Sequence, residues 1–300
     1  MGGNDVLREG NTVFHRVYLA SLSDALEERE SALQQVSVHE ALGAFEPVHD
    51  GIAERLGGRL RTHRPVLAGG AVVIAGYIVM ALVLIGMGLI ITKLLVGGPV
   101  GTWDNSVNRW FVTQRTPTLN SISSVGSALG ATLTVVGIAV AVSIVLAIGR
   151  HWLELGFLVA GLTVEATTAL TTSILVNRPR PTVIRLDASP PTASFPSGHT
   201  AAAIVLYVIL ALVLASFVRS PAVRALGWSF AIAIPIFVGV SRLYRGMHHP
   251  TDVIGSVVLG AGSLLFALLA SRTANAVSER DTRDAGTTEA SSPTPAGVLP

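Results

Sequence analysis

The sequence predicts an all-α, polytopic membrane bundle with about six transmembrane helices. Half of the 300 residues are hydrophobic and only 13% are charged, which is about half the charged share of an average soluble domain. Several stretches of about 17–28 residues carry no charge, and a helix of that length crosses the hydrocarbon core of a bilayer. These observations indicate an integral membrane protein.

The composition also limits the function. The chain contains no cysteine, so it forms neither disulfides nor thiolate metal sites. Its net charge is only +2 and no tract is rich in lysine or arginine, so we expect no nucleic-acid partner. No dense cluster of Asp and Glu is available to hold Mg²⁺ or Zn²⁺, and we expect neither a metal nor another cofactor.

Composition divides the chain into three regions. Residues 1–64 are polar, lack an early apolar core and are predicted to be a partly helical cytoplasmic extension rather than a signal peptide. Within them, 17–35 is moderately amphipathic, which fits a helix on a surface or a solvated helix without a specific role. Residues 65–275 hold the apolar segments and form the membrane domain. Residues 276–300 are rich in Ser, Thr, Pro and charges, which predicts a disordered tail.

Six apolar segments are expected to span the membrane, in the ranges 67–92, 128–149, 153–176, 200–218, 224–240 and 253–271. Arginines gather before the first span, between the second and third, between the fourth and fifth, and after the sixth. The positive-inside rule places these ends, and both termini, in the cytoplasm. The connections that then face outward are 93–127, 177–199 and 241–252.

The outward connections also contain arginine, against this rule. Those in the second and third connections are Arg178, Arg180, Arg185, Arg242 and Arg245. Because the positive-inside rule disfavours them there, we expect them to have another task, and binding an anion is the natural one.

The segment PSGHT (196–200) lies at the predicted start of the fourth span. Ser197 suits an N-cap, and the apolar run from Ala201 fits a plain helix start. A helix N-terminus is also an anion site, because its first N–H groups are free. Gly198 lets a ligand approach the backbone, and His199 can donate a proton near neutral pH. This segment alone leaves both interpretations open.

The segment SRLYRGMHHPTD (241–252) joins the last two spans. Asp252 suits an N-cap, and a lone histidine in such a loop is usually only solvated. However, a carboxylate four residues after His248 can orient the imidazole ring, as the acid of a catalytic triad does. His248 is therefore a candidate nucleophile or base, and Arg242 a candidate clamp for an oxyanion.

The segment NRPRP (177–181) ends the third span. Its arginines fit the C-terminal end of a helix, and its prolines fit a helix stop. Span parity nevertheless places this segment, PSGHT and the 241–252 loop on one membrane face. Arginines, two histidines, an aspartate and a helix N-terminus on one face suit phosphoryl transfer, in which one histidine attacks phosphorus and the other protonates the leaving oxygen.

These segments resemble the type 2 phosphatidic acid phosphatase superfamily, which includes bacterial undecaprenyl pyrophosphate phosphatases and vanadium haloperoxidases. The family motifs are K-x6-R-P, P-S-G-H and S-R-x5-H-x3-D. The second matches in full at 196–199. The third matches in full at Ser241, Arg242, His248 and Asp252. The resemblance covers about residues 100–271.

The resemblance implies a role for each matching residue. His248 is the nucleophile that forms a phosphohistidine, Asp252 orients it, and His199 protonates the leaving group. The implied phosphate ligands are Arg180, Arg242, Ser197, Gly198 and, as a further candidate, Arg178. The implied fold is a helical bundle in the cell membrane with its site at the outer face, and the implied substrate is a lipid phosphate or pyrophosphate.

The first motif lacks its lysine. Counting back seven from Arg180 reaches Ser173, and the alternative register from Arg178 reaches Thr171; neither is a lysine. The sole lysine of the chain, Lys93, is not assigned to the motif by the sequence. Arg178 and Arg185 are candidates to replace the lost charge. A charge-assisted contact is worth about 1.5–3 kcal/mol, so we expect slower or altered catalysis rather than none.

Two other functions stay open at this point. If Ser173 marks a degenerate site, the protein is a non-catalytic lipid-phosphate binder or a transport partner. A vanadate-dependent haloperoxidase would use the same pocket, but the multiple spans and the missing lysine disfavour it. The sequence identifies neither a protein partner nor the lipid, because undecaprenyl pyrophosphate, phosphatidic acid and phosphatidylglycerol phosphate present similar groups.

Glu165 lies within the third predicted span, where a charge is costly. A proton relay or a substrate contact is one interpretation. A protonated or paired Glu that faces the bundle interior is the other, and we favour it.

Overall fold

The structure is a computed structural model that describes residues 45–290 except 48, 61, 63 and 189–191, with side chains as far as residue 282. The chain divides into two units, Met1–Ala44 and Phe45–Pro300. The amphipathic segment 17–35 and the last residues of the predicted tail lie outside the described residues. All the regular elements in the described ranges are helices, which confirms the predicted all-α class.

Five helices are long and apolar enough to cross a bilayer. They correspond to the first and to the third to sixth predicted spans. The first is α3 (Pro65–Leu89), which continues as a short π-helix, η1 (Ile90–Leu95). The others are α7 (Trp152–Val176), α8 (Gly198–Phe217), α9 (Pro221–Tyr244) and α10 (Pro250–Ala290).

The second predicted span, 128–149, is part of a bent pair in the structure. α5 (Pro117–Leu129) and α6 (Thr132–Ile148) meet at 45°, and they are long and apolar enough for a crossing only when taken together. The bend lies at Gly130, where an added Cβ would come within 2.6 Å of the carbonyl oxygen of His199. Only glycine permits this approach, which sets the start of α6 beside the start of α8.

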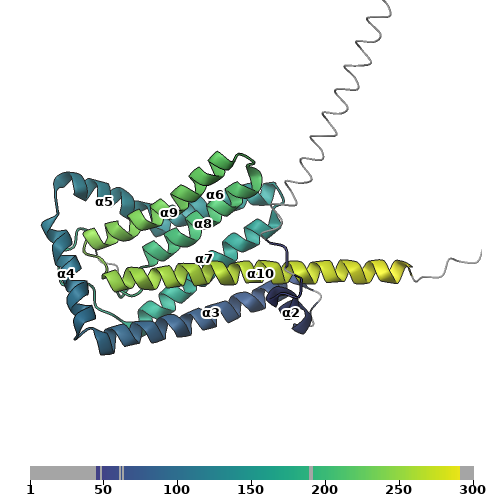
Figure 1. Ribbon diagram of the computed structural model, residues 1–300, viewed down its shortest axis with the longest axis horizontal. Helices are drawn as coiled ribbons and strands as arrows, with labels where there is room; N and C mark the ends of the chain where they lie inside the picture. Colours follow the sequence, from purple (N-terminus) through teal and green to yellow (C-terminus); the bar gives the residue numbers. More distant parts are fainter. Residues whose placement is uncertain (1–44, 48, 61, 63, 189–191, 291–300) are drawn as a thin grey trace, which may run out of the picture. The chain divides into compact units, whose positions relative to one another are not determined.

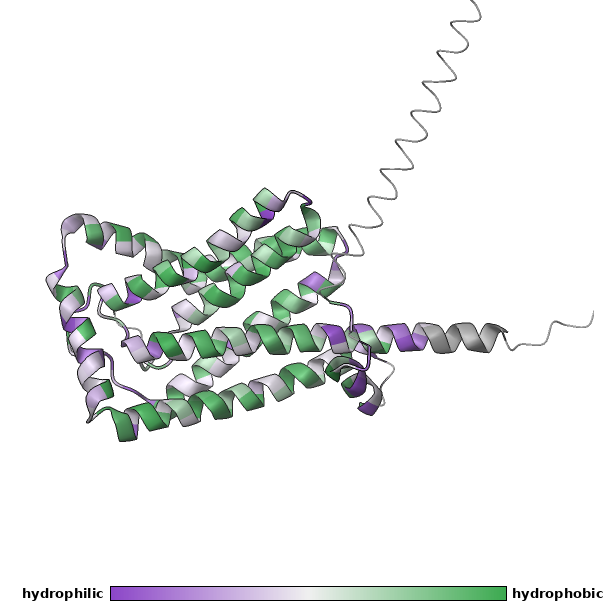
Figure 2. Cartoon of the chain, viewed as in Figure 1, coloured by the Kyte–Doolittle hydropathy of each residue, from purple (hydrophilic) through white to green (hydrophobic). Residues whose placement is uncertain are grey.

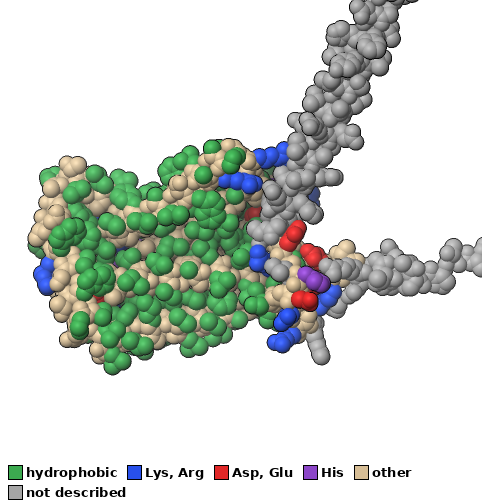
Figure 3. Space-filling view, viewed as in Figure 1, with side chains coloured by type: hydrophobic (Ala, Val, Ile, Leu, Met, Phe, Trp, Pro, Cys, Tyr) green, Lys and Arg blue, Asp and Glu red, His purple; other side chains and the backbone are tan. Residues whose placement is uncertain are grey.

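Apolar side chains cover the outside of these helices. Leu133 and Ile148, for example, are 87% and 79% exposed. Figure 3 shows apolar side chains along the length of the bundle, with charged ones gathered at the end where α2 (Ile52–Arg59) lies. Figure 2 shows the same distribution as hydropathy. Exposed apolar surface of this extent marks contact with lipid, so the protein is a multi-pass membrane protein.

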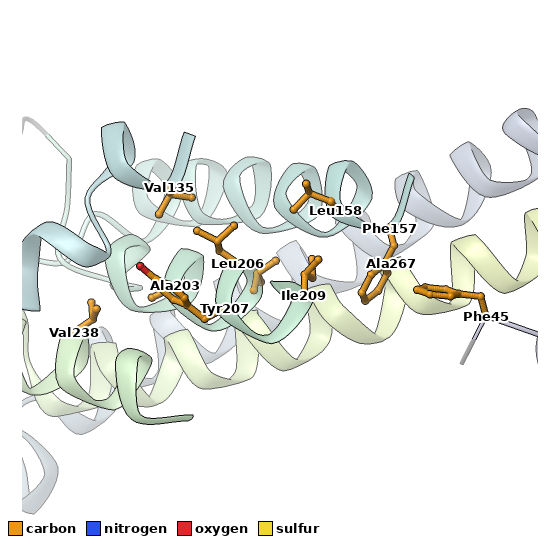
Figure 4. Packing of buried hydrophobic residues seen from close by; sticks show 11 residues of the cluster. Phe45, Val135, Phe157, Leu158, Ala203, Leu206, Tyr207, Ile209, Val238 and Ala267 are labelled. Atoms are coloured by element: carbon orange, nitrogen blue, oxygen red, sulfur yellow. The ribbon is translucent and has the colours of Figure 1, made fainter. Parts of the chain in front are cut away.

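The helix α10 is central to the bundle and packs against α2, α3, α7 and α8 (Figure 1). Buried side chains of α7, α8 and α10, such as Phe157, Leu206 and Ala267, form one core cluster (Figure 4). A second cluster joins α3, α7, α8 and α10 to the loop before α8, through Leu84, Val164, Phe195, Ala201 and Leu259. These clusters hold fixed the helix ends that carry the polar segments.

The helix α10 continues into the stretch for which composition predicts a disordered tail. Val277 is 1% exposed, and it lies against Gly57 of α2. Arg280 donates hydrogen bonds to the carbonyl oxygens of Gly57 at 3.4 Å and Thr62 at 2.9 Å. The structure therefore differs from the predicted boundary at 276, because packing against α2 gives this polar segment a buried face that composition does not reveal.

The helix α4 (Pro99–Thr113) lies at the end of the bundle where α9 ends and α10 begins (Figure 1). Trp103 and Trp110 are exposed, whereas Asp104 and Asn108 on the same helix are buried against the bundle. Two polar side chains of α4 thus enter the region in which the sequence motifs meet.

Candidate active site

The three segments that the sequence singles out meet at one end of the bundle, as span parity predicts. They border a pocket of about 780 Å³ that runs on between α6 and α7. The polar residues at its head are Ser173, Arg180, Gly198, His199, Arg242 and His248. Both histidines and two arginines of the predicted set therefore share one pocket.

The imidazole of His248 is buried, and its hydrogen bonds define its tautomer. Nδ1 lies 2.8 Å from the carbonyl oxygen of Ser194. A carbonyl only accepts, so Nδ1 carries the hydrogen and Nε2 carries the lone pair. Nε2 accepts a long hydrogen bond from Nη1 of Arg180, at 3.4 Å.

Several groups set the pKa of His248. Burial lowers it and the charges of Arg242 and Arg180 act in the same direction, which outweighs the raising effect of Asp252. The side chain is therefore neutral at neutral pH, as a nucleophile must be.

Asp252 orients His248 less directly than the triad comparison predicts. Its Oδ2 lies 3.6 Å from Nδ1 of His248, which is an electrostatic contact and too long for a hydrogen bond. The same oxygen accepts hydrogen bonds from the Ser194 hydroxyl and from the backbone N–H of His249. Ser194 thus joins the two groups, because its hydroxyl binds Asp252 while its carbonyl binds His248.

Arg178 does not line the pocket, contrary to its predicted place among the phosphate ligands. Its side chain is 3% exposed and its guanidinium is shared between two carboxylates. Nη1 lies 2.5 Å from Oδ1 of Asp252, and Nη2 lies 2.7 Å from Oδ2 of Asp104. Because its guanidinium is already paired with Asp104 and Asp252, Arg178 is also unsuited to replace the missing lysine.

Asp104 is a member of this cluster that sequence reasoning missed. Its carboxylate accepts hydrogen bonds from the backbone N–H and the hydroxyl of Thr251. It therefore caps the first turn of α10 while it pairs with Arg178. Nearby, Nδ2 of Asn108 lies 3.2 Å from Nδ1 of His249. The sequence of α4 gave no signal for these contacts, which join residues far apart in the chain.

Arg242 lies at the pocket head, and its Nη1 donates hydrogen bonds to Ser127 at 2.6 Å and to Asp187 at 2.9 Å. Asp187 also pairs with Arg245 at 2.5 Å. Burial would raise the pKa of Asp187, but the hydrogen bonds and charges of Arg245 and Arg242 outweigh it and hold that pKa below its ordinary value. Asp187 is a second acid that the motifs did not indicate.

Two arginines keep a donor for a ligand. Arg180 donates through Nη1 to the carbonyl oxygen of Met247 at 2.7 Å and through Nη2 to that of Ala193 at 3.3 Å. The Nε atoms of Arg180 and Arg242 are buried and have no hydrogen-bond partner among the described residues. Buried donors of this kind are rare in folded proteins and point to an anion.

The helix α8 begins at Gly198 and presents its N-terminus to the pocket. Its first backbone hydrogen bond runs from Ala201 to the carbonyl of Ser197, so the preceding N–H groups have no partner within the helix. A Cβ at Gly198 would meet nothing within 4 Å, which leaves room for a ligand. The side chain of Ser197, in contrast, is buried against Thr200 at 3.0 Å and does not line the pocket.

The position of the missing lysine is occupied by Ser173, which lines the pocket head. Its Oγ accepts a hydrogen bond from the backbone N–H of Ala193 at 3.1 Å. Lys93 is exposed in η1 and does not line the pocket. The pKa of Arg180 is lowered, first by burial and also by the charge of Arg185, while Asp252 opposes this. Arg185 is therefore close enough to act on Arg180, and it remains the candidate to replace the missing lysine.

In the part of the chain that the structure describes, no group of three or more His, Asp or Glu side chains is arranged to hold a metal ion. The groups at the pocket head are instead suited to bind an anion and to transfer protons.

Known proteins share both the sequence pattern and the fold. The PAP2 superfamily matches at residues 154–276. Phosphatidylglycerophosphatase B of Bacillus subtilis is 29% identical over 185 residues, which are 60% of this chain and 88% of that protein. Undecaprenyl-diphosphatase BcrC of the same organism is 40% identical over 67 residues, 22% of this chain and 30% of that protein.

A solved structure is similar as well. The crystal structure of a transmembrane PAP2 type phosphatidylglycerolphosphate phosphatase from Bacillus subtilis aligns with a TM-score of 0.51 at 23% identity. The alignment covers 69% of this chain and 94% of that one, and it concerns the fold alone. The family match includes both complete motifs and runs from α7 into α10. The match to the PAP2 superfamily over residues 154–276 thus confirms the resemblance that the motifs indicate.

Proposed function

We propose that the protein is an integral membrane phosphatase that hydrolyses a lipid phosphate or pyrophosphate through a phosphohistidine at His248. The observation that carries this proposal is the set of side chains at the pocket head. Two histidines share the pocket with two arginines, and the Nε–H of each arginine is buried without a hydrogen-bond partner among the described residues. The names of the relatives, which are lipid phosphatases, support the substrate class.

In the first step, the lone pair of His248 Nε2 attacks phosphorus and the bond to the leaving oxygen breaks. His199 gives its proton to that oxygen. The carboxylate of Asp252, 3.6 Å from Nδ1, stabilises the positive charge that develops on the ring. The two pocket arginines and the free N–H groups of α8 stabilise the charge on the phosphoryl oxygens.

In the second step, His199 accepts a proton from a water molecule, and the resulting oxygen nucleophile attacks the phosphohistidine. The P–N bond breaks, inorganic phosphate leaves, and His248 regains its lone pair. Because the Ser194 carbonyl holds the Nδ1 hydrogen throughout, the same ring nitrogen is ready for the next substrate.

The apolar part of the pocket supports a substrate with a hydrocarbon chain. It continues from the catalytic head between α6 and α7, and it is lined by Val136, Ala139, Val140, Leu158, Val159, Leu162 and Leu170. Several of these side chains are also exposed on the lipid-facing surface. A membrane lipid can therefore place its chain here while its phosphate reaches His248.

We also propose that the site faces outward and that both chain termini lie in the cytoplasm. Arg55, Arg59, Arg150, Arg219 and Arg224 lie near the helix ends opposite the site, as the positive-inside rule requires of a cytoplasmic end, and Arg272 lies in α10 just beyond the sixth predicted span. Because the chain has no cysteine, Ile184→Cys beside the site and Ile52→Cys on α2 are clean probes in intact cells. A membrane-impermeant maleimide should label only the first, and labelling of only the second would reverse the orientation.

Phosphate release by the detergent-purified protein tests the activity. We expect release from a panel of lipid phosphates and pyrophosphates without added metal, and its loss in His248→Ala. His151→Ala, at the opposite end of α7, is the matched histidine control. Full activity of His248→Ala would refute the proposed nucleophile.

Ser173 gives a specific reason to consider a second function, a binder without turnover. This alternative predicts that the native protein binds a lipid phosphate but releases no phosphate, even at high enzyme concentration. Binding measured beside release in the same preparation separates the two functions.

A further inference from the structure

Glu165 faces the apolar part of the pocket, and the proposed mechanism does not use it. It lies on α7, between the polar pocket head and the far end of the apolar part of the pocket, which is the groove between α6 and α7. Its side chain is 4% exposed. Among the residues that the structure describes, no group hydrogen-bonds or pairs with its carboxyl group.

A carboxyl group at this position has no structural explanation. Most of its neighbours in the groove are apolar, among them Leu162 and Ala169, and the polar ones, Ser143, Thr163 and Thr167, are uncharged hydroxyl residues. An apolar side chain would pack there without loss of hydration. Glu154 on the same helix is a useful contrast, because it lies 3.9 Å from Nδ1 of His151 and does not line the pocket. An unpaired charge within the membrane is costly, so the Glu165 carboxyl is expected to be uncharged and able to donate one hydrogen bond.

Glu165 is too far from the phosphate to take part in the chemistry. Ser173, at the pocket head, lies two helical turns further along α7, which is about 12 Å at 1.5 Å per residue. This distance excludes direct proton transfer between Glu165 and the reacting atoms. With the phosphate bound at the pocket head beside Ser173, the carboxyl group would instead meet a part of the lipid on the order of 12 Å from phosphorus.

The chemistry of the lipid at that distance differs between substrate classes. An extended chain advances about 1.2 Å per bond. In phosphatidic acid the ester carbonyls are about five bonds from phosphorus, or about 6 Å on that scale. In phosphatidylglycerol phosphate they are about eleven bonds from the terminal phosphorus, or about 13 Å. A polyprenyl pyrophosphate offers no acceptor beyond its phosphates.

We propose that Glu165 is a specificity-determining residue, which donates a hydrogen bond to an acyl ester carbonyl of the substrate. It favours glycerolipids in which a glycerol phosphate unit separates the scissile phosphate from the acyl esters. This inference rests on the proposed phosphatase function and adds the class of lipid to it.

The test compares kcat/KM of the native protein, Glu165→Leu and Glu165→Gln on three substrates. These are phosphatidylglycerol phosphate, phosphatidic acid and the water-soluble p-nitrophenyl phosphate. In Glu165→Leu we expect kcat/KM for phosphatidylglycerol phosphate to fall about three- to tenfold, mainly through KM, because one neutral hydrogen bond is lost. The other two substrates should change less than about twofold.

Two variants guard against a loss of folding. Glu165→Gln keeps a donor at the same place and should retain the preference for phosphatidylglycerol phosphate. Glu154→Gln changes the other buried acid of α7 outside the pocket and should leave all three substrates unaffected.

Three outcomes would overturn the inference. Unchanged kcat/KM of Glu165→Leu for phosphatidylglycerol phosphate would show that the carboxyl group does not contact this lipid. An equal loss on all three substrates, p-nitrophenyl phosphate included, would show a structural role. If the native protein hydrolyses none of the three but releases phosphate from a polyprenyl pyrophosphate, the inference fails while the phosphatase function stands. If it releases phosphate from no member of the wider panel, the phosphatase function itself fails, and this is visible before any variant is compared.

Discussion

Replacing Ser173 with lysine is expected to raise phosphatase activity, because it returns a cation to the place where the family motif carries one. Ser173 lines the pocket head, and its hydrogen-bond partner Ala193 is also bound by Arg180. A lysine side chain from this position enters the pocket beside that guanidinium. The phosphoryl group would then meet three cationic side chains instead of two.

The size of the effect is the difference between two hydrogen bonds, the charged one that lysine would make to the phosphoryl group and the neutral one that serine makes now. A hydrogen bond to a charged group contributes about 1.5–3 kcal/mol, and the neutral bond between Ser173 and Ala193 about 0.5–1.5 kcal/mol. The difference of the mid-points is about 1.2 kcal/mol, which corresponds to roughly an eightfold rise in kcat/KM.

Phosphate release from the best substrate of the panel measures this effect. Ser173→Met is the matched control, because methionine has a similar length and lacks the charge. If Ser173→Lys is no more active than Ser173→Met, or falls below the native protein, the reasoning is wrong. The site would then be complete without the lysine.

Three other perturbations test the electrostatics of the site. Since the pKa of His248 lies below the ordinary 6.5, its imidazole should stay neutral as the pH falls through 6.5, and NMR of ¹⁵N-labelled histidine, assigned with His248→Ala, reads this directly. The lowered pKa of Asp187 means that its stabilising contribution is complete above its unfolded-state value of 3.8 and is lost as the pH falls through the lower folded value. Asp187→Asn should therefore lower the thermal stability in detergent at pH 7, with a smaller effect as the pH falls below 3.8; an equal loss at every pH would contradict this assignment. Asp104→Asn should lower stability by about 1–3 kcal/mol, because Arg178 loses one of two buried carboxylate partners, and unchanged thermal unfolding would show that the pair contributes nothing.

The sequence predicts much of this architecture because membrane helices are recognisable by their length and hydropathy. Five of the six expected spans are single helices in the structure. The parity of the spans then predicts that the polar segments share one end, and the contact between Arg178 and Asp252 confirms it. The bend at Gly130 was not predictable, since its cause is a close approach to His199 from a distant helix.

The site was predicted in part for a related reason. A motif specifies spacing along the chain, and this was sufficient to place His248, His199 and the pocket arginines together. It does not specify which partner each side chain binds. Arg178 binds two acids instead of facing the pocket, and the carboxylate of Asp104 comes from α4, which no motif marks. The carbonyl of Ser194 could not be predicted from the sequence, because any residue supplies a carbonyl.

The groove between α6 and α7 is edged by side chains such as Val136 and Leu170, which are about half exposed on the surface that faces lipid. A substrate of the proposed phosphatase would therefore enter from the surrounding lipid. The concentration that sets its rate is then the mole fraction of substrate in the bilayer rather than its concentration in the bulk solution. Dilution of the substrate with inert lipid should slow turnover, whereas adding more vesicles of the same composition should not. The dephosphorylated lipid keeps its anchor and returns to the leaflet from which it came. Catalysis at this site would thus change the composition of one leaflet without moving lipid between the two.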